Sequence, residues 1–304
     1  MSLRLKKDWR ISLRLKQGNR RNGAAQLLGI KRMLQEKIGV IGAGKIGAAI
    51  MRGVIAAGLV DKDRLMASDV SKNLRHAVAA ELGIQVTPSN TKLCEFADIV
   101  ILAVKPQIVD TVLREIAKGL GKGKLLVSVA AGVPLSRIET HLAKGGRAVR
   151  VMPNIPCVVR AGASCYAGGK HATATDLEKV GAILSSFGIA LPLEEKYLDA
   201  VTGLSGSGPA YVFLFIESLA DGGVQVGLSR DVALKLALQT VYGAALIALE
   251  SGKHLGELRD EVTSPGGTTI AGLYALEKGR MRGTVMEAVL QATRRSQELG
   301  KGQS

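Results

Sequence analysis

The segment that most restricts the fold is the glycine-rich turn Gly42-Ala43-Gly44-Lys45-Ile46-Gly47, which directly follows the apolar stretch 38–41. A G-x-G-x-x-G pattern between a buried strand and a helix is typical of a dinucleotide-binding turn. Gly42 would permit the tight turn, Gly44 would let a pyrophosphate approach the backbone, and Gly47 would allow close contact between helix and strand. Free N–H groups at the start of the helix would then face the phosphates. The alternative is a glycine-rich turn that holds no ligand.

Short β-branched stretches alternate with amphipathic stretches from residue 37 to about residue 150. This alternation predicts a doubly wound α/β sheet of parallel strands joined by right-handed crossovers. The predicted strands are 38–41, 65–68, 99–104, 125–129 and 148–151, and the predicted helices are 46–57, 71–82 and 108–117. A further strand, helix and strand, with strands at 163–167 and 189–191 and a helix capped by Thr175, should extend the same sheet.

The β pattern ends after Glu194, and long helical patterns cover 210–226, 231–250, 268–277 and 281–299. We therefore expect a basic N-terminal extension over 1–34, an α/β dinucleotide-binding domain over 35–195 and an all-α domain over 196–304. The stretch 233–249 is apolar on nearly every side, so it must be enclosed all round. Burial between the subunits of an obligate homo-oligomer is our interpretation, and the central helix of a monomeric bundle is the alternative.

The formal net charge of +15 is concentrated at the N-terminus, because residues 1–32 carry +9 of it. The remaining charge is ordinary for an enzyme of anionic ligands, and the 3% of aromatic residues disfavours a stacking platform for nucleic acid. We find no stretch of about eighteen uncharged apolar residues, so we expect neither secretion nor a membrane span but a cytoplasmic protein. We interpret the extension as the product of a start codon assigned too far upstream, with Met33 as the expected start. A transit peptide and a solvated basic tail are the alternatives.

The cysteines and histidines give no sign of a metal site or of a His-centred catalytic dyad. Cys94, Cys157 and Cys165 are odd in number and lie at no metal-ligand spacing, which indicates a reducing compartment and no structural metal. The four histidines are scattered along the chain.

The end of the second predicted strand would decide between the two nicotinamide cofactors, and its signals conflict. Asp69 could accept hydrogen bonds from the ribose hydroxyls of NADH. Ser68 and Ser71, together with Lys72 or Arg75, could hold the 2′-phosphate of NADPH. We expect both NADH and NADPH to be used, with a slight preference for NADPH. Alternatively, the basic residues form only a solvated helix face.

Further candidate segments follow two later strands and precede two helices. Ala103–Pro106 and Ala130–Gly132 come directly after strands, at the edge where a parallel sheet forms its ligand crevice. The segments 201–210 and 262–269 combine glycine and hydroxyl residues at helix starts, which suits a small carboxylate. Each of the four would also serve as an ordinary turn.

Taken together, these segments resemble the pyrroline-5-carboxylate reductase family. The matching segments are the glycine-rich turn, 103–106, 130–132, 150–154, 202–210 and 264–269. The resemblance covers about Lys37 to Leu299, and the order and spacing of its motifs are highly specific. It implies a Rossmann-type domain followed by an all-α dimerisation domain, a homodimer or a ring of dimers such as a homodecamer, and a substrate site completed across the dimer.

The resemblance further implies an oxidoreductase of proline biosynthesis, which passes a hydride from NADPH or NADH to 1-pyrroline-5-carboxylate and forms L-proline without a metal. The cofactor residues, together with Asp69 at the end of the second predicted strand, are Ile41, Gly42, Ala43, Gly44, Lys45, Ile46, Gly47, Ser68, Asn90, Ala103, Val104, Lys105, Pro106, Ala130, Ala131 and Gly132. The substrate residues are Glu195, Ser264, Gly266, Gly267, Thr268 and Thr269. We expect the backbone N–H groups of 266–269 to bind the carboxylate, and the Thr269 hydroxyl to make a catalytic hydrogen bond to the imine nitrogen.

Two other functions stay open at this point. A related 3-hydroxy-acid dehydrogenase would need a catalytic lysine in the helical half, where Lys235 and Lys253 are the candidates. A non-enzymatic nucleotide-sensing or polyanion-binding protein would use the basic extension.

Overall fold

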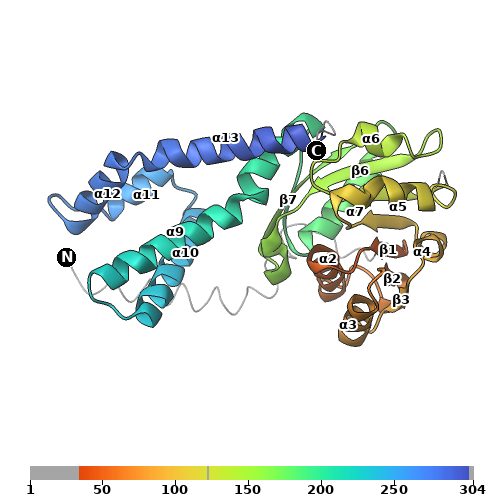
Figure 1. The fold of residues 1–304 in the computed structure, drawn as a ribbon, viewed down its shortest axis with the longest axis horizontal. Coiled ribbons are helices and arrows are strands. Elements are labelled where there is room, and N and C mark those ends of the chain that lie inside the picture. The colour runs from red at the N-terminus through yellow and green to blue at the C-terminus, as the bar shows by residue number, and fades with distance from the viewer. Residues whose placement is uncertain (1–33, 122, 301–304) are drawn as a thin grey trace.

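The computed structural model describes residues 34–121 and 123–300. The predictions made for residues 1–33 therefore lie outside the described residues. Figure 1 shows an α/β part at one end of the molecule and an elongated helical part that extends away from it.

A single eight-stranded sheet forms the α/β part, with the strand order β3-β2-β1-β4-β5-β6-β7-β8. The strands are β1 (Ile38–Ile41), β2 (Leu65–Ser68), β3 (Gln85–Thr87), β4 (Ile99–Leu102), β5 (Leu125–Ser128), β6 (Arg147–Met152), β7 (Gly162–Gly168) and β8 (Gly188–Pro192). Neighbouring strands are parallel except for β6 and β7, which are antiparallel. The predicted doubly wound sheet is confirmed, and β3 is the strand that the pattern did not predict.

Helices cover both faces of this sheet. They are α2 (Lys45–Ala56), α3 (Lys72–Leu82), α4 (Asn90–Phe96), α5 (Val109–Ile116), α6 (Leu135–Glu139) and α7 (Ala174–Ser185). The apolar sides of α2, α3 and α7 pack in one buried core, and those of α4, α5 and α6 pack in a second core on the opposite face. The four apolar residues of α5, Val109, Val112, Leu113 and Ile116, show why: their spacing places them on one side of the helix, and all are buried.

The start of α7 corrects one prediction, because Thr173 and not Thr175 is its N-cap. The Thr173 hydroxyl accepts a hydrogen bond from the Asp176 N–H, and the Asp176 carboxylate accepts one from the Thr173 N–H at 2.9 Å. Asp176 is also buried, and its Oδ1 lies 2.5 Å from Arg147 Nη1. This pairing fixes Asp176 as the third helical residue, and the cap therefore falls two residues earlier than predicted.

The helical part consists of two arms that diverge from the sheet (Figure 1). After the short helix η4 (Glu195–Tyr197), α8 (Leu198–Val201) continues through a π-helix (Thr202–Gly206) into α9 (Gly208–Gln225). α9 and α10 (Arg230–Ser251) form one arm. α11 (Leu255–Glu261) and α12 (Thr268–Lys278) lie at the far end of the other arm, and α13 (Met281–Gly300) runs back to the sheet.

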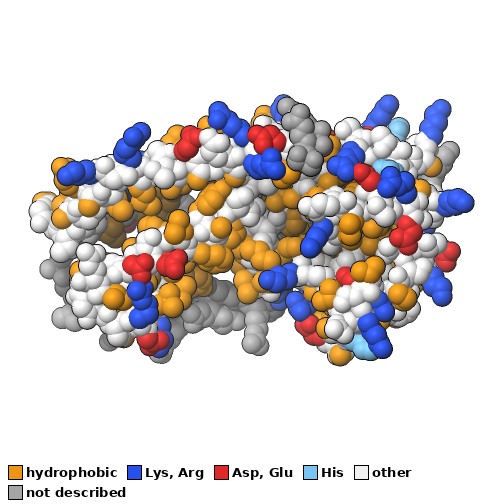
Figure 2. All heavy atoms as spheres, viewed as in Figure 1, with side chains coloured by type: hydrophobic (Ala, Val, Ile, Leu, Met, Phe, Trp, Pro, Cys, Tyr) orange, Lys and Arg blue, Asp and Glu red, His pale blue; other side chains and the backbone are white. Residues whose placement is uncertain are grey.

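The arms bury little apolar surface of their own. Their buried cluster consists of Ile216, Ala220, Ala233 and Ala237. In contrast, Leu249 of α10 is 83% exposed and Tyr274 of α12 is 70% exposed. Figure 2 shows hydrophobic side chains gathered along the sides of the arms that face each other. An exposed apolar surface of this extent is typical of a protein–protein interface, which agrees with the predicted burial between subunits.

α10 is buried in this chain only at Ala233 and Ala237, so a central place in a monomeric bundle is wrong for it. By length and composition alone, with a mean hydropathy of 1.7 in its most apolar window, α10 is also able to cross a membrane. Packing of this helix between subunits would cover the same apolar surface.

Candidate functional site

The three glycines of the dinucleotide turn differ in what surrounds them. Gly42 has a φ of 102°, and a Cβ there would lie 2.4 Å from the Ala103 carbonyl oxygen. A Cβ on Gly47 would lie 1.9 Å from the Gly42 carbonyl oxygen. A Cβ on Gly44 would meet no atom of the described residues within 4 Å. The fold therefore requires glycine at the first and third positions, whereas the second leaves open space at the start of α2, where a phosphate group would fit.

Asp69 braces this turn from the end of the neighbouring strand. Its carboxylate accepts hydrogen bonds from the backbone N–H groups of Ala43 and Ser71, each at 2.8 Å. The Gly42 N–H donates to the Ser68 carbonyl oxygen at 2.8 Å. Asp69 thus lies beside the turn, and both of its carboxylate oxygens hold backbone groups in place.

The residues proposed to bind a 2′-phosphate differ in their exposure and in their contacts. Ser68 is fully buried, and its hydroxyl donates to the Asn90 side-chain carbonyl at 2.7 Å, so it orients Asn90 and does not face solvent. Ser71 caps α3, and Lys72 is exposed at the first position of that helix. The Arg75 guanidinium donates to the Asp69 carbonyl oxygen at 2.6 Å, which keeps it next to the end of β2.

The loops that follow β4 and β5 lie at the same edge of the sheet as the glycine-rich turn. The register places Ile41, Leu102 and Ser128, the last residues of three adjacent strands, side by side. Ala103–Pro106 and Ala130–Gly132 start directly after two of these strands. All the predicted cofactor residues therefore belong to the carboxyl-terminal ends of β1, β2, β4 and β5 or to the starts of α2 and α4, which is the ligand edge of a doubly wound sheet.

Glu195 lies near the end of the same edge, where the chain leaves the sheet for the helices. Its Oε1 accepts hydrogen bonds from the Leu135 N–H at 2.6 Å and from Arg150 Nη1 at 3.1 Å. Arg150 Nη2 donates to the Asp199 carboxylate at 3.2 Å. The sequence patterns did not predict the pairing of Arg150 with Glu195 and Asp199. A charged residue between Val149 and Val151 in an apolar strand was nevertheless a signal for Arg150.

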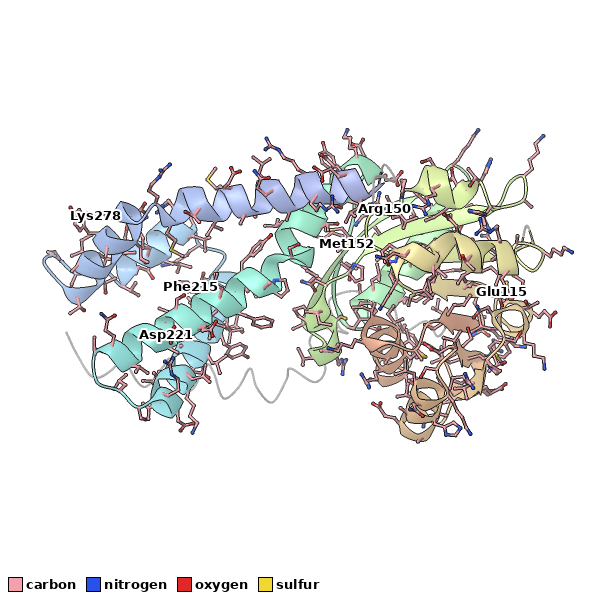
Figure 3. The ribbon with its side chains drawn as sticks, viewed as in Figure 1. Glu115, Arg150, Met152, Phe215, Asp221 and Lys278 are labelled. Atoms are coloured by element: carbon pink, nitrogen blue, oxygen red, sulfur yellow. The ribbon has the colours of Figure 1, made fainter. Side chains whose placement is uncertain are left out.

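The Ser264–Thr269 segment lies away from this edge, because it connects α11 to α12 at the far end of the helical part (Figure 1). Gly266 has a φ of 64°, and the Gly267 N–H donates to the Ser264 carbonyl oxygen at 3.1 Å. Gly267 is the N-cap of α12, so Thr268 and Thr269 occupy its first turn. In Figure 3, Lys278 of the same helix lies at the far end of the helical part, well away from Arg150 at the junction with the sheet. One chain thus brings the predicted cofactor residues together but not the predicted substrate residues.

Three buried cysteines and the candidate lysine Lys235 lie outside this edge. Burial raises the pKa of the Cys94, Cys157 and Cys165 thiols, which disfavours a thiolate nucleophile. Among residues 34–121 and 123–300, no three His, Cys, Asp or Glu side chains gather into a candidate metal site. Lys235 is ion-paired with Asp231 at 2.7 Å on the exposed surface of α10.

Comparison with known proteins extends over nearly the whole described chain. A pyrroline-5-carboxylate reductase from Methanosarcina acetivorans is 51% identical over 269 residues, which cover 88% of this chain and 100% of that protein. One from Arabidopsis thaliana is 47% identical and covers 87% of this chain and 96% of that protein. The chain belongs to the pyrroline-5-carboxylate reductase family. The resemblance seen in the sequence motifs is confirmed.

Family models and solved structures agree with this assignment. The family described as pyrroline-5-carboxylate reductase dimerisation matches residues 195–299, and NADP oxidoreductase coenzyme F420-dependent matches residues 37–132. The crystal structure of Plasmodium falciparum pyrroline carboxylate reductase with NADP bound superimposes with a TM-score of 0.80 at 38% identity, over 88% of this chain and 100% of that one. A pyrroline-5-carboxylate reductase from Coxiella burnetii gives a TM-score of 0.83 at 36% identity, over 88% of this chain and 99% of that one.

The chain is accordingly an NAD(P)H-dependent oxidoreductase. Neither alternative function receives support. Lys235 and Lys253, the candidates for a dehydrogenase lysine, are both ion-paired on exposed parts of the helical arms, with Asp231 and Glu257 respectively. The extension on which a polyanion-binding function would depend lies outside the described residues.

Proposed function

We infer that this chain reduces 1-pyrroline-5-carboxylate to L-proline with a reduced nicotinamide nucleotide as hydride donor. The observation that carries the inference is the combination of 51% identity to a reductase of that name over its full length with a complete dinucleotide edge on the sheet. Hydride transfer to the C=N carbon needs no covalent intermediate, so the protein has to orient the two reactants and favour the protonated imine.

The residues at the sheet edge fit the cofactor. Open space at Gly44 and the N–H groups at the start of α2 suit the pyrophosphate, and Asp69 lies where it can also accept a ribose hydroxyl. The segments 103–106 and 130–132 continue along the edge and would line the nicotinamide half. When bound, the nicotinamide supplies the hydride.

We propose that NADPH is preferred over NADH, although both are used. Ser71 and Lys72 present a hydroxyl, a helix N-terminus and a cation where an adenosine 2′-phosphate would lie. Asp69 opposes this preference by its charge, but its two carboxylate oxygens already accept N–H groups, which reduces its effect on a neighbouring anion.

We propose that the substrate site is shared between two chains. The N–H groups of Gly266 to Thr269 would bind the substrate carboxylate, and the Thr269 hydroxyl would make a hydrogen bond to the ring nitrogen. Within one chain this loop is at the far end of an arm (Figure 1). In the proposed dimer it would instead lie against the sheet of the other subunit, near the residue that corresponds to Glu195. The family name for residues 195–299 and the uncovered arms support pairing through these helices.

The remaining assignments are proposals of the same kind. The assembly would be an obligate homodimer that can form a homodecamer, the location cytoplasmic, and no metal, membrane or nucleic acid would be needed. The division into domains at 195 follows the end of the sheet at Pro192.

The decisive experiment is an assay of the purified chain with 1-pyrroline-5-carboxylate and either NADPH or NADH, followed by the loss of nicotinamide absorbance and by the appearance of proline. We expect turnover with both nucleotides and a higher kcat/KM with NADPH. Nucleotide binding without turnover of either would contradict the proposed reaction, and a higher kcat/KM with NADH would contradict only the proposed preference.

A further inference from the structure

Arg150 is a buried charge at the point where the sheet meets the helical arms. It is 5% exposed and lies in β6 between Val149 and Val151, which are 0% and 1% exposed. Figure 3 shows Arg150 and Met152 at this junction. A buried guanidinium is stable only when its charge and its N–H donors are paired. Arg150 satisfies this requirement with two carboxylates, Glu195 at 3.1 Å and Asp199 at 3.2 Å.

Each of these carboxylates holds a second element of the structure. The Glu195 oxygen that faces Arg150 also accepts the N–H of Leu135, the first residue of α6, at 2.6 Å. The Asp199 oxygen that faces Arg150 also accepts the hydroxyl of Ser296, in the last turns of α13, at 2.8 Å. Ser296 is 3% exposed, so this contact is shielded from water.

The two elements held in this way enclose the loop Ala130–Gly132. α6 begins shortly after the loop, and the end of α13 packs against it. A Cβ added to Gly132, whose φ is 71°, would lie 3.6 Å from the Leu299 Cβ and 3.7 Å from the Ser296 carbonyl oxygen. The guanidinium of Arg150 therefore fixes, through one carboxylate on each side, both boundaries of this loop.

We propose that Arg150 is a positioning residue of the reductase site. Through Glu195 and Asp199 it holds Ala130–Gly132 in the shape that receives the nicotinamide half of the cofactor, and it touches neither cofactor nor substrate. The Glu195 side chain is 33% exposed, so the same pairing also fixes the part of this carboxylate that faces the proposed substrate site. This inference rests on the proposed function.

The test compares Arg150→Met and Arg150→Lys with the parent enzyme. We expect Arg150→Met to lower kcat/KM for 1-pyrroline-5-carboxylate by about tenfold to a hundredfold, because a misplacement of roughly 1 Å at a reacting group has effects of this size. The dissociation constant of NADPH, measured by fluorescence without substrate, should change by less than about threefold, since the glycine-rich turn is untouched. Arg150→Lys should restore only part of the loss, because an ammonium lacks the fork that reaches two carboxylates.

Arg147→Met is the matched control. Arg147 Nη1 is paired at 2.5 Å with the buried Asp176 Oδ1. It is the first residue of β6, three residues before Arg150. Its loss should lower stability and leave kcat/KM within about threefold. A folded Arg150→Met variant with the parent kcat/KM, or an equal loss in Arg147→Met, would overturn the proposal. If Arg150→Met does not fold, Ser296→Ala can replace it, because this variant removes only the link to α13. An unchanged kcat/KM in Ser296→Ala would also overturn the proposal.

Hydrogen exchange separates this inference from the proposed function. Arg150→Met or Ser296→Ala should speed amide exchange in residues 130–136 and 296–300, whereas Arg147→Met should not. If the parent enzyme does not reduce 1-pyrroline-5-carboxylate, the proposed function fails, and the exchange data still decide whether Arg150 holds the loop. Unchanged exchange in those segments would overturn the inference whatever the reaction is.

Discussion

Gly44 and Gly47 belong to one motif but are constrained by different neighbours. The backbone oxygen of Gly42 lies where a side chain on Gly47 would have to be, whereas a side chain on Gly44 has open space around it. Gly44 also has a φ of −70°, which any residue adopts. Folding therefore restricts Gly47, and the proposed ligand restricts Gly44.

We expect Gly44→Ala to weaken NADPH binding by about tenfold to a hundredfold, because a methyl group there would keep the pyrophosphate from charge-assisted hydrogen bonds with the backbone. The free energy of unfolding of the Gly44→Ala variant should equal that of the parent. Gly47→Ala should weaken binding and also lower the free energy of unfolding by about 1–3 kcal/mol, since α2 must move away from β1. Fluorescence titration with NADPH and urea unfolding measure the two effects. Equal stability of both variants would contradict the distinction.

Thr269 is the residue to which we assign the hydrogen bond to the imine nitrogen. We expect Thr269→Ala to lower kcat/KM by roughly tenfold to a thousandfold, as for the removal of one positioned hydrogen bond. Thr284→Ala is the control, because the Thr284 hydroxyl donates to the Arg280 carbonyl oxygen within the same arm and belongs to no proposed site. Steady-state kinetics on the folded variants decide the matter, and a Thr269→Ala enzyme with parent kinetics would remove the assignment.

At the scale of elements, an ion pair links α5 to α6, the helices that come after the two loops following β4 and β5. Arg137 of α6 makes an ion pair with Asp110 of α5 at 2.5 Å, and His141 lies 3.2 Å from the same carboxylate. The hydrogen bond from Arg137, followed by its charge and that of His141, holds the pKa of Asp110 below its ordinary value. A carboxyl group with a lowered pKa in the folded state stabilises the fold above its ordinary pKa, and this stabilisation disappears as the pH falls through the lowered value.

We therefore expect Arg137→Met to be less stable than the parent at pH 7, by about 0.2–1 kcal/mol, which is the range for partly exposed ion pairs. The difference should shrink as the pH falls below about 4, where an Asp carboxyl in the unfolded chain takes up a proton, and further as the pH falls through the lowered pKa of folded Asp110. Urea unfolding of both proteins between pH 7 and pH 3 provides the measurement. A stability difference that grows towards acid pH would show that the pair does not act in this way.

The elements that the sequence predicted are those whose pattern is set by burial on the sheet. β1 and β4 are apolar at every position because both of their faces are covered, and α5 repeats its apolar residues at the helical period. β3 was missed because it has three residues and begins with the exposed Gln85. The links of Arg150 to Glu195 and Asp199 join residues far apart in the sequence, so no local pattern reveals them.

For the whole molecule, the decisive feature is the separation of the two predicted halves of the site. The cofactor residues lie on the sheet, and the Ser264–Thr269 loop is at the end of an arm (Figure 1). Motifs in a single sequence predict both halves, but in the proposed site they come together only when a second chain is present. In a symmetric dimer each chain would contribute one half to each of two equivalent sites.

Two defective variants should therefore complement each other. Co-expression of Gly44→Ala with Thr269→Ala gives mixed dimers in which one site carries both defects and the other carries none. In the mixed dimers we expect about one half of the parent activity at limiting NADPH, well above either variant alone, because one of their two sites is intact. Purification with a different tag on each chain and assay of the doubly tagged dimers measures this. Activity no higher than the average of the two variants would show that both halves come from the same chain.

The order of the elements along the chain has a consequence for biosynthesis. All eight strands precede α8, so the sheet can close while the arms are still being translated. The arms have few buried contacts of their own. In the proposed dimer they would reach a stable packing only when a second copy arrives. The slow, concentration-dependent step in maturation should then be the meeting of two nascent or newly released chains, and a chaperone that shields α10 would govern the yield.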